Sequence, residues 1–229
     1  MTLIIHHLQV SQSERIVWLA EELGIDYRLV IHKRDPFLSP QSIKDLNPLG
    51  QAPVIQDDLI TLPESGACAE YILQKYGNGK LALGPSHKDY AQYLYWFHFA
   101  NGNLHPQLTR VMVLKLSNVN PDEFHAQRHF LQLEKFLKFI DNHLKDKEWL
   151  VGDEFTAADC MNVFPLTTMR TFSGLDLSEY PNILRYLKRV SERGGYQRAR
   201  AKGDPDLLLM IDGKPPAQFL DRLKEEGKI

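Results

Sequence analysis

The stretch NPLGQAPVIQDDLITLPES, residues 47–65, contains two short apolar segments separated by two turn-forming residues. The segments are residues 53–56 and 59–62, and the two aspartates between them are typical of a β-hairpin. A proline at the start of the first strand fits the edge of a sheet, because proline has no N–H to donate. Apolar residues at helical spacing follow over 65–76. The stretch therefore predicts two antiparallel strands followed by a helix.

The residues before this hairpin alternate between strand and helix patterns. Residues 3–8 and 27–32 suit strands, and residues 16–23 carry apolar side chains at helical spacing. A helix between two strands is the usual crossover between parallel strands. A short helix is also predicted over 41–46. These elements together predict an α/β domain of order βαβ–loop–ββα over residues 1–80.

The second half of the chain shows helical patterns only. Residues 77–88 contain three glycines and a proline and are predicted to be a linker. Apolar residues at helical spacing over 133–144 and 183–190 predict an all-α helical bundle over residues 88–229. The polar tail after residue 204 is expected to pack over this bundle rather than form a third domain.

The composition narrows the class of protein. The 229 residues include 43% hydrophobic and 24% charged residues, with a net charge of −2, which is ordinary for a folded globular chain. This charge gives no general attraction to nucleic acid or to a membrane surface, and no apolar run approaches the ~18 residues of a membrane helix. The two cysteines, Cys68 and Cys160, lie in different halves, which favours buried thiols in a reducing, cytoplasmic compartment over a disulfide framework.

Ser11 precedes Glu14 by three residues at the predicted start of the first helix, and this spacing allows two interpretations. In the first, the two side chains form a capping box for the helix. In the second, the Ser11 hydroxyl and the helix N-terminus stabilise a bound thiolate, because a helix N-terminus lowers the pKa of a thiol. The serine would then act as a hydrogen-bond donor and not as a nucleophile.

Two further positions also allow a structural and a functional interpretation. Pro53 is either an ordinary trans proline or a cis proline that turns the Ala52 backbone toward an extended peptide. Ser65 is either the N-cap of the helix over 65–76 or, together with Glu64, a site for the carboxylate and ammonium groups of a ligand.

Two other motifs favour a structural interpretation. Thr156 and Asp159 have the spacing of a capping box, which predicts the start of a core helix. His6 and His7 are adjacent in a predicted strand, so their side chains point to opposite faces and cannot hold one metal ion together. No metal site is predicted.

Taken together, these features resemble the glutathione transferase family, with its thioredoxin-like N-terminal domain and helical C-terminal domain. The resemblance depends on four stretches in register over about residues 1–200, and it is nearest to the serine-type fungal and bacterial group related to the theta and phi classes. The stretches are the following: His7-Leu8…Ser11-x-Ser13-x-Arg15-Ile16-x-Trp18-Leu19-x-Glu21-Glu22-Leu23…Tyr27; Asn47-Pro48-Leu49-Gly50-Gln51-Ala52-Pro53-Val54; Leu62-x-Glu64-Ser65-x-Ala67; and Val151-Gly152-Asp153…Phe155-Thr156-Ala157-Ala158-Asp159.

The resemblance implies a role for each matching position. Ser11 matches the serine that activates glutathione, the co-substrate, and Ser13 is a weaker alternative. The resemblance also implies a glutathione site and, in outline, a pocket for a second substrate near the first helix of the bundle. The glutathione site would comprise Gln51, Ala52, the cis-proline Pro53, Glu64 and Ser65, and the second pocket Phe99, Asn103 and His105.

The expected function is conjugation of glutathione thiolate to electrophilic apolar substrates, with peroxidase activity as a second expected reaction. The expected assembly is a homodimer. The alternatives are a non-catalytic glutathione-binding module on the same fold and a specialised glutathione-dependent isomerase or dehalogenase. Gln12, where relatives often have arginine, Pro63 before Glu64, and the tail after residue 204 depart from the family pattern.

Overall fold

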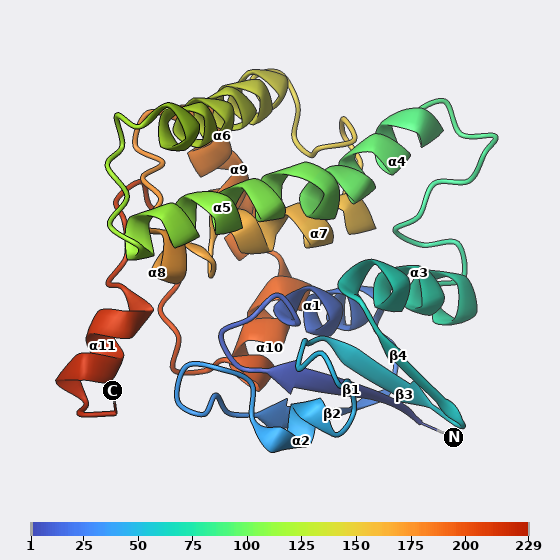
Figure 1. Ribbon diagram of the computed structural model, residues 1–229. Helices are drawn as coiled ribbons and strands as arrows, with labels where there is room; N and C mark the ends of the chain where they lie inside the picture. Colours follow the sequence, from blue (N-terminus) through green and yellow to red (C-terminus); the bar gives the residue numbers. More distant parts are fainter. Residues whose placement is uncertain (1, 229) are drawn as a thin grey trace.

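The computed structural model describes residues 2–228. A four-stranded sheet occupies the N-terminal part, with strand order β2-β1-β3-β4 (Figure 1). β1 and β2 are parallel, and the β1–β3 and β3–β4 pairs are antiparallel. The strands are β1 (Leu3–Leu8), β2 (Tyr27–His32), β3 (Val54–Asp57) and β4 (Ile60–Pro63).

Helices cover both faces of this sheet. α1 (Glu14–Leu23) and α3 (Ser65–Tyr76) lie on the face toward the helical part, and α2 (Gln41–Lys44) lies on the other face (Figure 1). The predicted βαβ crossover, hairpin and following helix are therefore confirmed. The hairpin turn lies at Asp58 and Leu59, one residue later than predicted, because Asp57 still pairs with Ile60 in the sheet. Asp58 adopts a left-handed conformation (φ 55°), which aspartate tolerates better than most residues.

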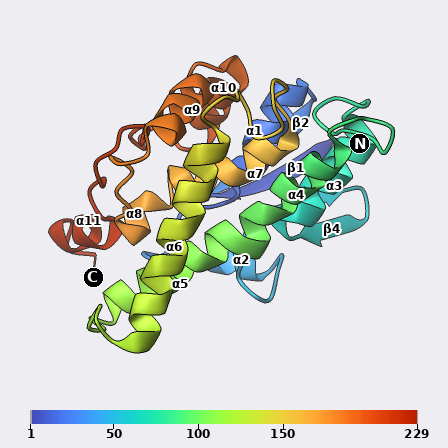
Figure 2. The ribbon, with the colours of Figure 1, turned by 90° about the horizontal axis from the view of Figure 1, so that it is seen from above.

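The C-terminal part is helical throughout. α4, a π-helical turn η1 and α5 follow one another without a break, and α6 and α7 pack alongside them (Figure 2). The elements are α4 (Tyr90–Phe99), η1 (Ala100–Leu104), α5 (His105–Leu116), α6 (Phe124–His143), α7 (Ala157–Leu166), α8 (Arg170–Ser173), α9 (Pro181–Ser191), α10 (Gly194–Gly203) and α11 (Phe219–Glu225). Within residues 2–228, no helix is long and apolar enough to cross a membrane.

α10 returns from the helical part and packs against α1 of the N-terminal part (Figure 1). Trp18 on α1 contacts Tyr196 on α10 with a ring-centroid distance of 5.0 Å. Glu21, also on α1, accepts hydrogen bonds from Arg198 and Lys202 on α10. Apolar burial and ion pairs therefore join the two parts, and the chain after α10 begins close to the N-terminal sheet.

α7 is the central core helix, and every residue from Ala157 to Leu166 is buried. Its predicted capping box is present, because the Asp159 carboxylate accepts the backbone N–H of Thr156 (2.9 Å). The same carboxylate also accepts the Leu150 N–H (3.0 Å) and the Tyr186 hydroxyl (3.1 Å). Asp159 therefore fixes the loop before α7 and α9 beside it, as well as the helix start.

Candidate functional site

A cleft of about 270 Å³ lies between the loops of the N-terminal part and helices α5, α7 and α8. One wall is polar and comes from the loops after β1 and before β3, including Ser11, Gln51 and Ala52. The opposite wall is largely apolar and comes from the helical part. It contains His105, Thr109, Met112, Phe164, Met169 and Phe172. A cleft with one polar and one apolar wall suits two different substrates held side by side.

The Ser11 hydroxyl does not form the predicted capping box. It donates to the Leu8 carbonyl (2.7 Å) and lies 2.8 Å from the Ser13 hydroxyl oxygen. The Glu14 carboxylate accepts a hydrogen bond from Thr168 of the helical part (2.5 Å) instead of reaching back to Ser11. Ser11 lines the cleft although the residue is only 6% exposed, so its hydroxyl is largely shielded from bulk water.

The residue before Ser11 is strained. Val10 has φ 54°, a left-handed conformation that is a real outlier for a β-branched side chain. Its backbone N–H donates to Asp204 (2.9 Å), and its carbonyl accepts from Arg34 (2.9 Å). Such a conformation costs on the order of 1–3 kcal/mol and persists only when its surroundings hold it. The loop that presents Ser11 is therefore fixed from both sides.

Pro53 lies in the loop that leads to β3, directly after the cleft residues Gln51 and Ala52. The Ala52–Pro53 peptide bond is cis, which the family resemblance implied for this position. Gln51 and Ala52 line the cleft directly before it, and the Asn47 side chain donates to the Gln51 carbonyl (2.9 Å). Asn47 therefore holds the segment that borders the cleft.

Glu64 and Ser65 lie at the start of α3. Glu64 is exposed and has φ 76°, again a left-handed conformation, and Ser65 is buried. The Ser65 hydroxyl accepts from the Asn101 side chain (3.0 Å) and from Arg15 (3.3 Å). Because Asn101 lies in η1, this serine joins the N-terminal part to the helical part.

Arg15 is a buried cation behind the cleft. One of its terminal nitrogens donates to Asn101 (2.8 Å) and Gln12 (3.1 Å), and the guanidinium lies 5.3 Å from the ring centre of Phe164. Its Nε and other terminal nitrogen are buried without a hydrogen-bond partner among residues 2–228. Burial lowers the pKa of Arg15 to about 9, which keeps the side chain charged at neutral pH. The cation therefore favours an anion in the neighbouring cleft.

The three residues expected in a second-substrate pocket lie in different places. His105 lines the cleft. Phe99 instead packs into an aromatic cluster with Trp96 (5.2 Å between ring centres) and Phe136 (5.5 Å). Asn103 is exposed and lines a separate depression between α5 and α6. The extra residue in the π-turn η1 shifts the helix faces at this point, which helical spacing alone does not reveal.

His105 stays neutral at the cleft wall. Burial, and then the Arg15 guanidinium, lower the pKa of His105 to about 3. Between pH 6.5 and pH 3 the unfolded chain therefore binds a proton that the native protein does not, and stability falls as the pH falls. When the pH falls from about 7 to about 5, we expect the unfolding free energy of His105→Gln to fall by about 2 kcal/mol less than that of the wild type. Urea unfolding at both pH values measures this, with exposed His98→Gln as the control. Equal losses in wild type and His105→Gln would contradict it.

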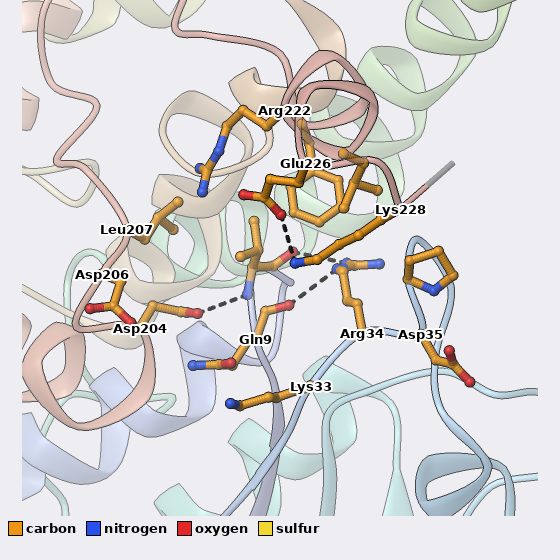
Figure 3. Close-up of a pocket in the computed structure, with 14 residues that line it drawn as sticks. Gln9, Lys33, Arg34, Asp35, Asp204, Asp206, Leu207, Arg222, Glu226 and Lys228 are labelled. Atoms are coloured by element: carbon orange, nitrogen blue, oxygen red, sulfur yellow. Dashed lines mark hydrogen bonds and ion pairs between the residues drawn. The ribbon is translucent and has the colours of Figure 1, made fainter.

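A second cavity, of about 460 Å³, lies on the far side of Arg34, between the loops after β1 and β2 and helix α11 (Figure 3). Its wall carries charges of both signs, and Lys228 is already paired with Glu226 (2.6 Å). This mixed wall does not single out one kind of ligand. The chemistry is concentrated in the smaller cleft at Ser11.

The comparisons with known proteins agree with this geometry. Residues 11–75 match the family model described as "Glutathione S-transferase, N-terminal domain", and residues 105–194 match "Glutathione S-transferase, C-terminal domain". The chain is 34% identical over 225 residues to Glutathione S-transferase 3 of Schizosaccharomyces pombe, covering 91% of each protein. The chain belongs to the glutathione S-transferase family. By this homology it is an enzyme of the transferase class.

Solved structures of glutathione S-transferases support the fold. The crystal structure of a glutathione S-transferase from Actinobacillus pleuropneumoniae is 30% identical, with a TM-score of 0.79, and covers 89% of this chain and 93% of its own. A family member from Pseudomonas fluorescens, described with two glutathione molecules bound, is 20% identical with a TM-score of 0.72, covering 86% of this chain and 92% of its own. Homologues with this fold therefore bind glutathione.

Several cleft residues were not identified from the sequence. Arg34 and Phe37 lie in the irregular segment between β2 and α2, and Phe172 lies in the short helix α8. The Arg34 guanidinium stacks on the Phe172 ring at 5.2 Å. An Arg and a Phe in a loop carry no distinctive spacing, so no sequence signal marks them. Gln12 was noted only as a departure from the family pattern, and it both lines the cleft and accepts from Arg15.

Proposed function

We propose that this transferase activates glutathione as a thiolate at Ser11 and conjugates it to electrophilic apolar substrates. The observation that carries the proposal is the nearly buried Ser11 hydroxyl at the cleft, which Ala52, the residue before the cis-proline Pro53, also lines. A hydroxyl at this position can turn from the Leu8 carbonyl and donate to a sulfur anion in the cleft. The positive Arg15 favours the same anion.

The polar wall is proposed to hold the tripeptide. The backbone at 51–52 would pair with the cysteinyl unit, and exposed Glu64 would take the ammonium group of the γ-glutamyl end. Ser65 is already bonded to Asn101 and Arg15, so its expected contact with the ligand would be made from the N-terminus of α3. The apolar wall with Phe164, Phe172 and Met112 would hold the second substrate, and proximity of the two would supply much of the acceleration.

Several expectations about the whole molecule belong to the same proposal. We assign residues 1–80 to the glutathione-binding domain and residues 88–229 to the domain that holds the second substrate. A twofold homodimer and the serine-type group related to the theta and phi classes are part of it. Cys68 and Cys160 are both buried free thiols, which supports the proposal of a reducing, cytoplasmic compartment.

The Ser11→Ala variant tests the central role. We expect turnover to fall at least about tenfold, while the dissociation constant of glutathione changes less than about threefold, because the hydroxyl contacts the sulfur and not the rest of the tripeptide. Steady-state kinetics with an aryl halide and calorimetric titration with glutathione measure the two quantities. Ser86→Ala, in the exposed linker, is the control. Unchanged turnover in Ser11→Ala would exclude this role.

The same protein distinguishes the alternatives. Retention on a glutathione resin without turnover would indicate a non-catalytic binding module. Glutathione-dependent isomerisation or reductive dechlorination of a substrate, without conjugation of the aryl halide, would indicate a specialised isomerase or dehalogenase. Absence of any glutathione binding would overturn the proposal as a whole.

A further inference from the structure

Four buried side chains form a continuous chain of hydrogen bonds that ends at the cleft. The Asp204 carboxylate lies 3.0 Å from His7 Nε2, and His7 Nδ1 lies 2.8 Å from the Ser13 hydroxyl oxygen. The Ser13 oxygen lies 2.8 Å from the Ser11 oxygen. All four residues are at least nine-tenths buried, and they come from β1, the following loop and the segment after α10.

The chemistry of Asp204 sets the direction of this chain. A carboxylate accepts, so His7 Nε2–H donates to it, and the neutral ring then has an acceptor at Nδ1. Ser13 O–H donates to Nδ1, and the Ser13 oxygen accepts the Leu8 N–H (3.0 Å). The single Ser11 proton lies on the Leu8 carbonyl in this structure, and rotation of the hydroxyl brings it to the Ser13 oxygen, 2.8 Å away. Each donor is followed by an acceptor, so a proton that arrives at Ser11 can be passed on toward His7.

We propose that Asp204, His7 and Ser13 act through Ser11 as the acceptor for the proton of the glutathione thiol, an inference that depends on the function proposed above. The S–H bond breaks and its proton goes to the Ser11 oxygen. The Ser11 proton passes to the Ser13 oxygen, and the Ser13 proton forms a new bond to His7 Nδ1. The products are a thiolate in the cleft and an imidazolium paired with the Asp204 carboxylate. After the product leaves, reverse passage through Ser11 returns the proton to solvent.

The residues around this chain of hydrogen bonds hold His7 and Asp204 in fixed positions. A Cβ atom on Gly203 would lie 2.9 Å from His7 Nε2, so only glycine allows Asp204 to reach the ring at this distance. The Gln9 side chain donates to the Gly203 carbonyl (3.0 Å). The other oxygen of Asp204, a residue labelled near Gln9 in Figure 3, accepts the N–H of strained Val10. One carboxylate therefore orients the imidazole and also holds the loop that presents Ser11.

Other titratable groups face His7 from each packed element. Glu14 lies on α1, His32 on β2 and Arg200 on α10. Burial raises the pKa of Glu14, while the Arg200 guanidinium opposes that shift. Burial, and then His6 and His7, lower the pKa of His32. None of these three groups has a hydrogen bond to the His7 ring among residues 2–228, whereas Asp204 does, so Asp204 is the position at which to test the proposal.

Asp204→Asn tests the direction of proton transfer. An asparagine can still accept the Val10 N–H, but its amide donates to His7 Nε2, which places the ring proton on Nδ1 and removes the acceptor for Ser13. We expect turnover to fall at least about tenfold, and the pKa of the bound glutathione thiol to rise by at least about one unit. The dissociation constant of glutathione with a protonated thiol should change less than about threefold relative to the wild type. Ultraviolet absorbance of the thiolate as a function of pH gives the pKa directly.

Two further variants make the result decisive. Asp206→Asn makes the same charge change at an exposed position two residues away and should leave the thiol pKa unchanged. Ser13→Ala interrupts the chain while Asp204 and His7 stay intact, and it should raise the thiol pKa as Asp204→Asn does, even if Asp204→Asn does not fold. A wild-type thiol pKa in folded Asp204→Asn or Ser13→Ala would overturn the relay. If Ser11→Ala still loses turnover in that case, the proposed function stands without it.

Discussion

Replacement of Arg170 with alanine is expected to lower the free energy of unfolding by about 3–5 kcal/mol and to release the C-terminal segment from the helical part. The Arg170 side chain is fully buried, and its five N–H groups all donate to backbone carbonyls. The acceptors are the carbonyls of Leu175 (3.0 Å), Met210 (3.2 Å), Asp212 (2.7 Å), Gly213 (2.9 Å) and Lys214 (2.5 Å).

The physical reason is that the segment 210–214 has no regular secondary structure to satisfy these carbonyls. Without the guanidinium, several buried acceptors lose their donor and a cavity forms in their midst. Arg170→Lys should be almost as damaging, because one ammonium has three donors and lacks the planar fork of arginine.

Urea unfolding and limited proteolysis measure the two effects of Arg170→Ala. We expect new cleavage between residues 205 and 218 in the variant under native conditions. Arg185→Lys is the matched control, since Arg185 also donates to two backbone carbonyls but is exposed, and it should change stability by less than about 0.5 kcal/mol. A protected tail in Arg170→Ala would show that apolar contacts, such as Phe219 with Phe172, hold it instead.

Asp159→Asn is expected to cost about 2–4 kcal/mol of unfolding free energy near neutral pH. The carboxylate accepts two backbone N–H groups and the Tyr186 hydroxyl, and an amide has only one oxygen for the three donors. Thermal or urea unfolding measures the loss. Asp153→Asn, in the exposed loop before α7, is the control and should have little effect.

The pH dependence distinguishes this carboxylate from others. Burial raises the pKa of Asp159 to about 6, against the effect of its backbone donors. Between about pH 3.8 and pH 6 the native protein therefore binds a proton that the unfolded chain has lost, so the contribution of Asp159 to stability falls as the pH rises. We expect the loss caused by Asp159→Asn to be larger near pH 4 than near pH 7. An equal or larger loss at the higher pH would show that the carboxylate is ionised in the native protein over the whole range.

The positions and order of the strands and helices follow from the residues within each segment. The hairpin over 53–62, the crossover between strands and the capping box at Thr156 all depend on neighbouring residues, whose spacing is visible in the chain. The family motifs also marked Ser11 and Pro53 as site residues. Local chemistry decides such features, so reasoning from the sequence reaches them.

The direction of the Ser11 hydroxyl and its connection to His7 and Asp204 depend on contacts between distant segments. Thr168 donates to the Glu14 carboxylate that a capping box would need, and the Ser11 hydroxyl donates to the Leu8 carbonyl instead. Asp204 bonds to His7 although 197 positions separate them in the chain. Phe99 packs among aromatic rings at the end of α4, and Asn103, inside the π-turn, lines a separate depression, so of the three only His105 lines the cleft. Each outcome is a competition for hydrogen bonds or space between distant segments, and no local spacing in the sequence records which partner wins.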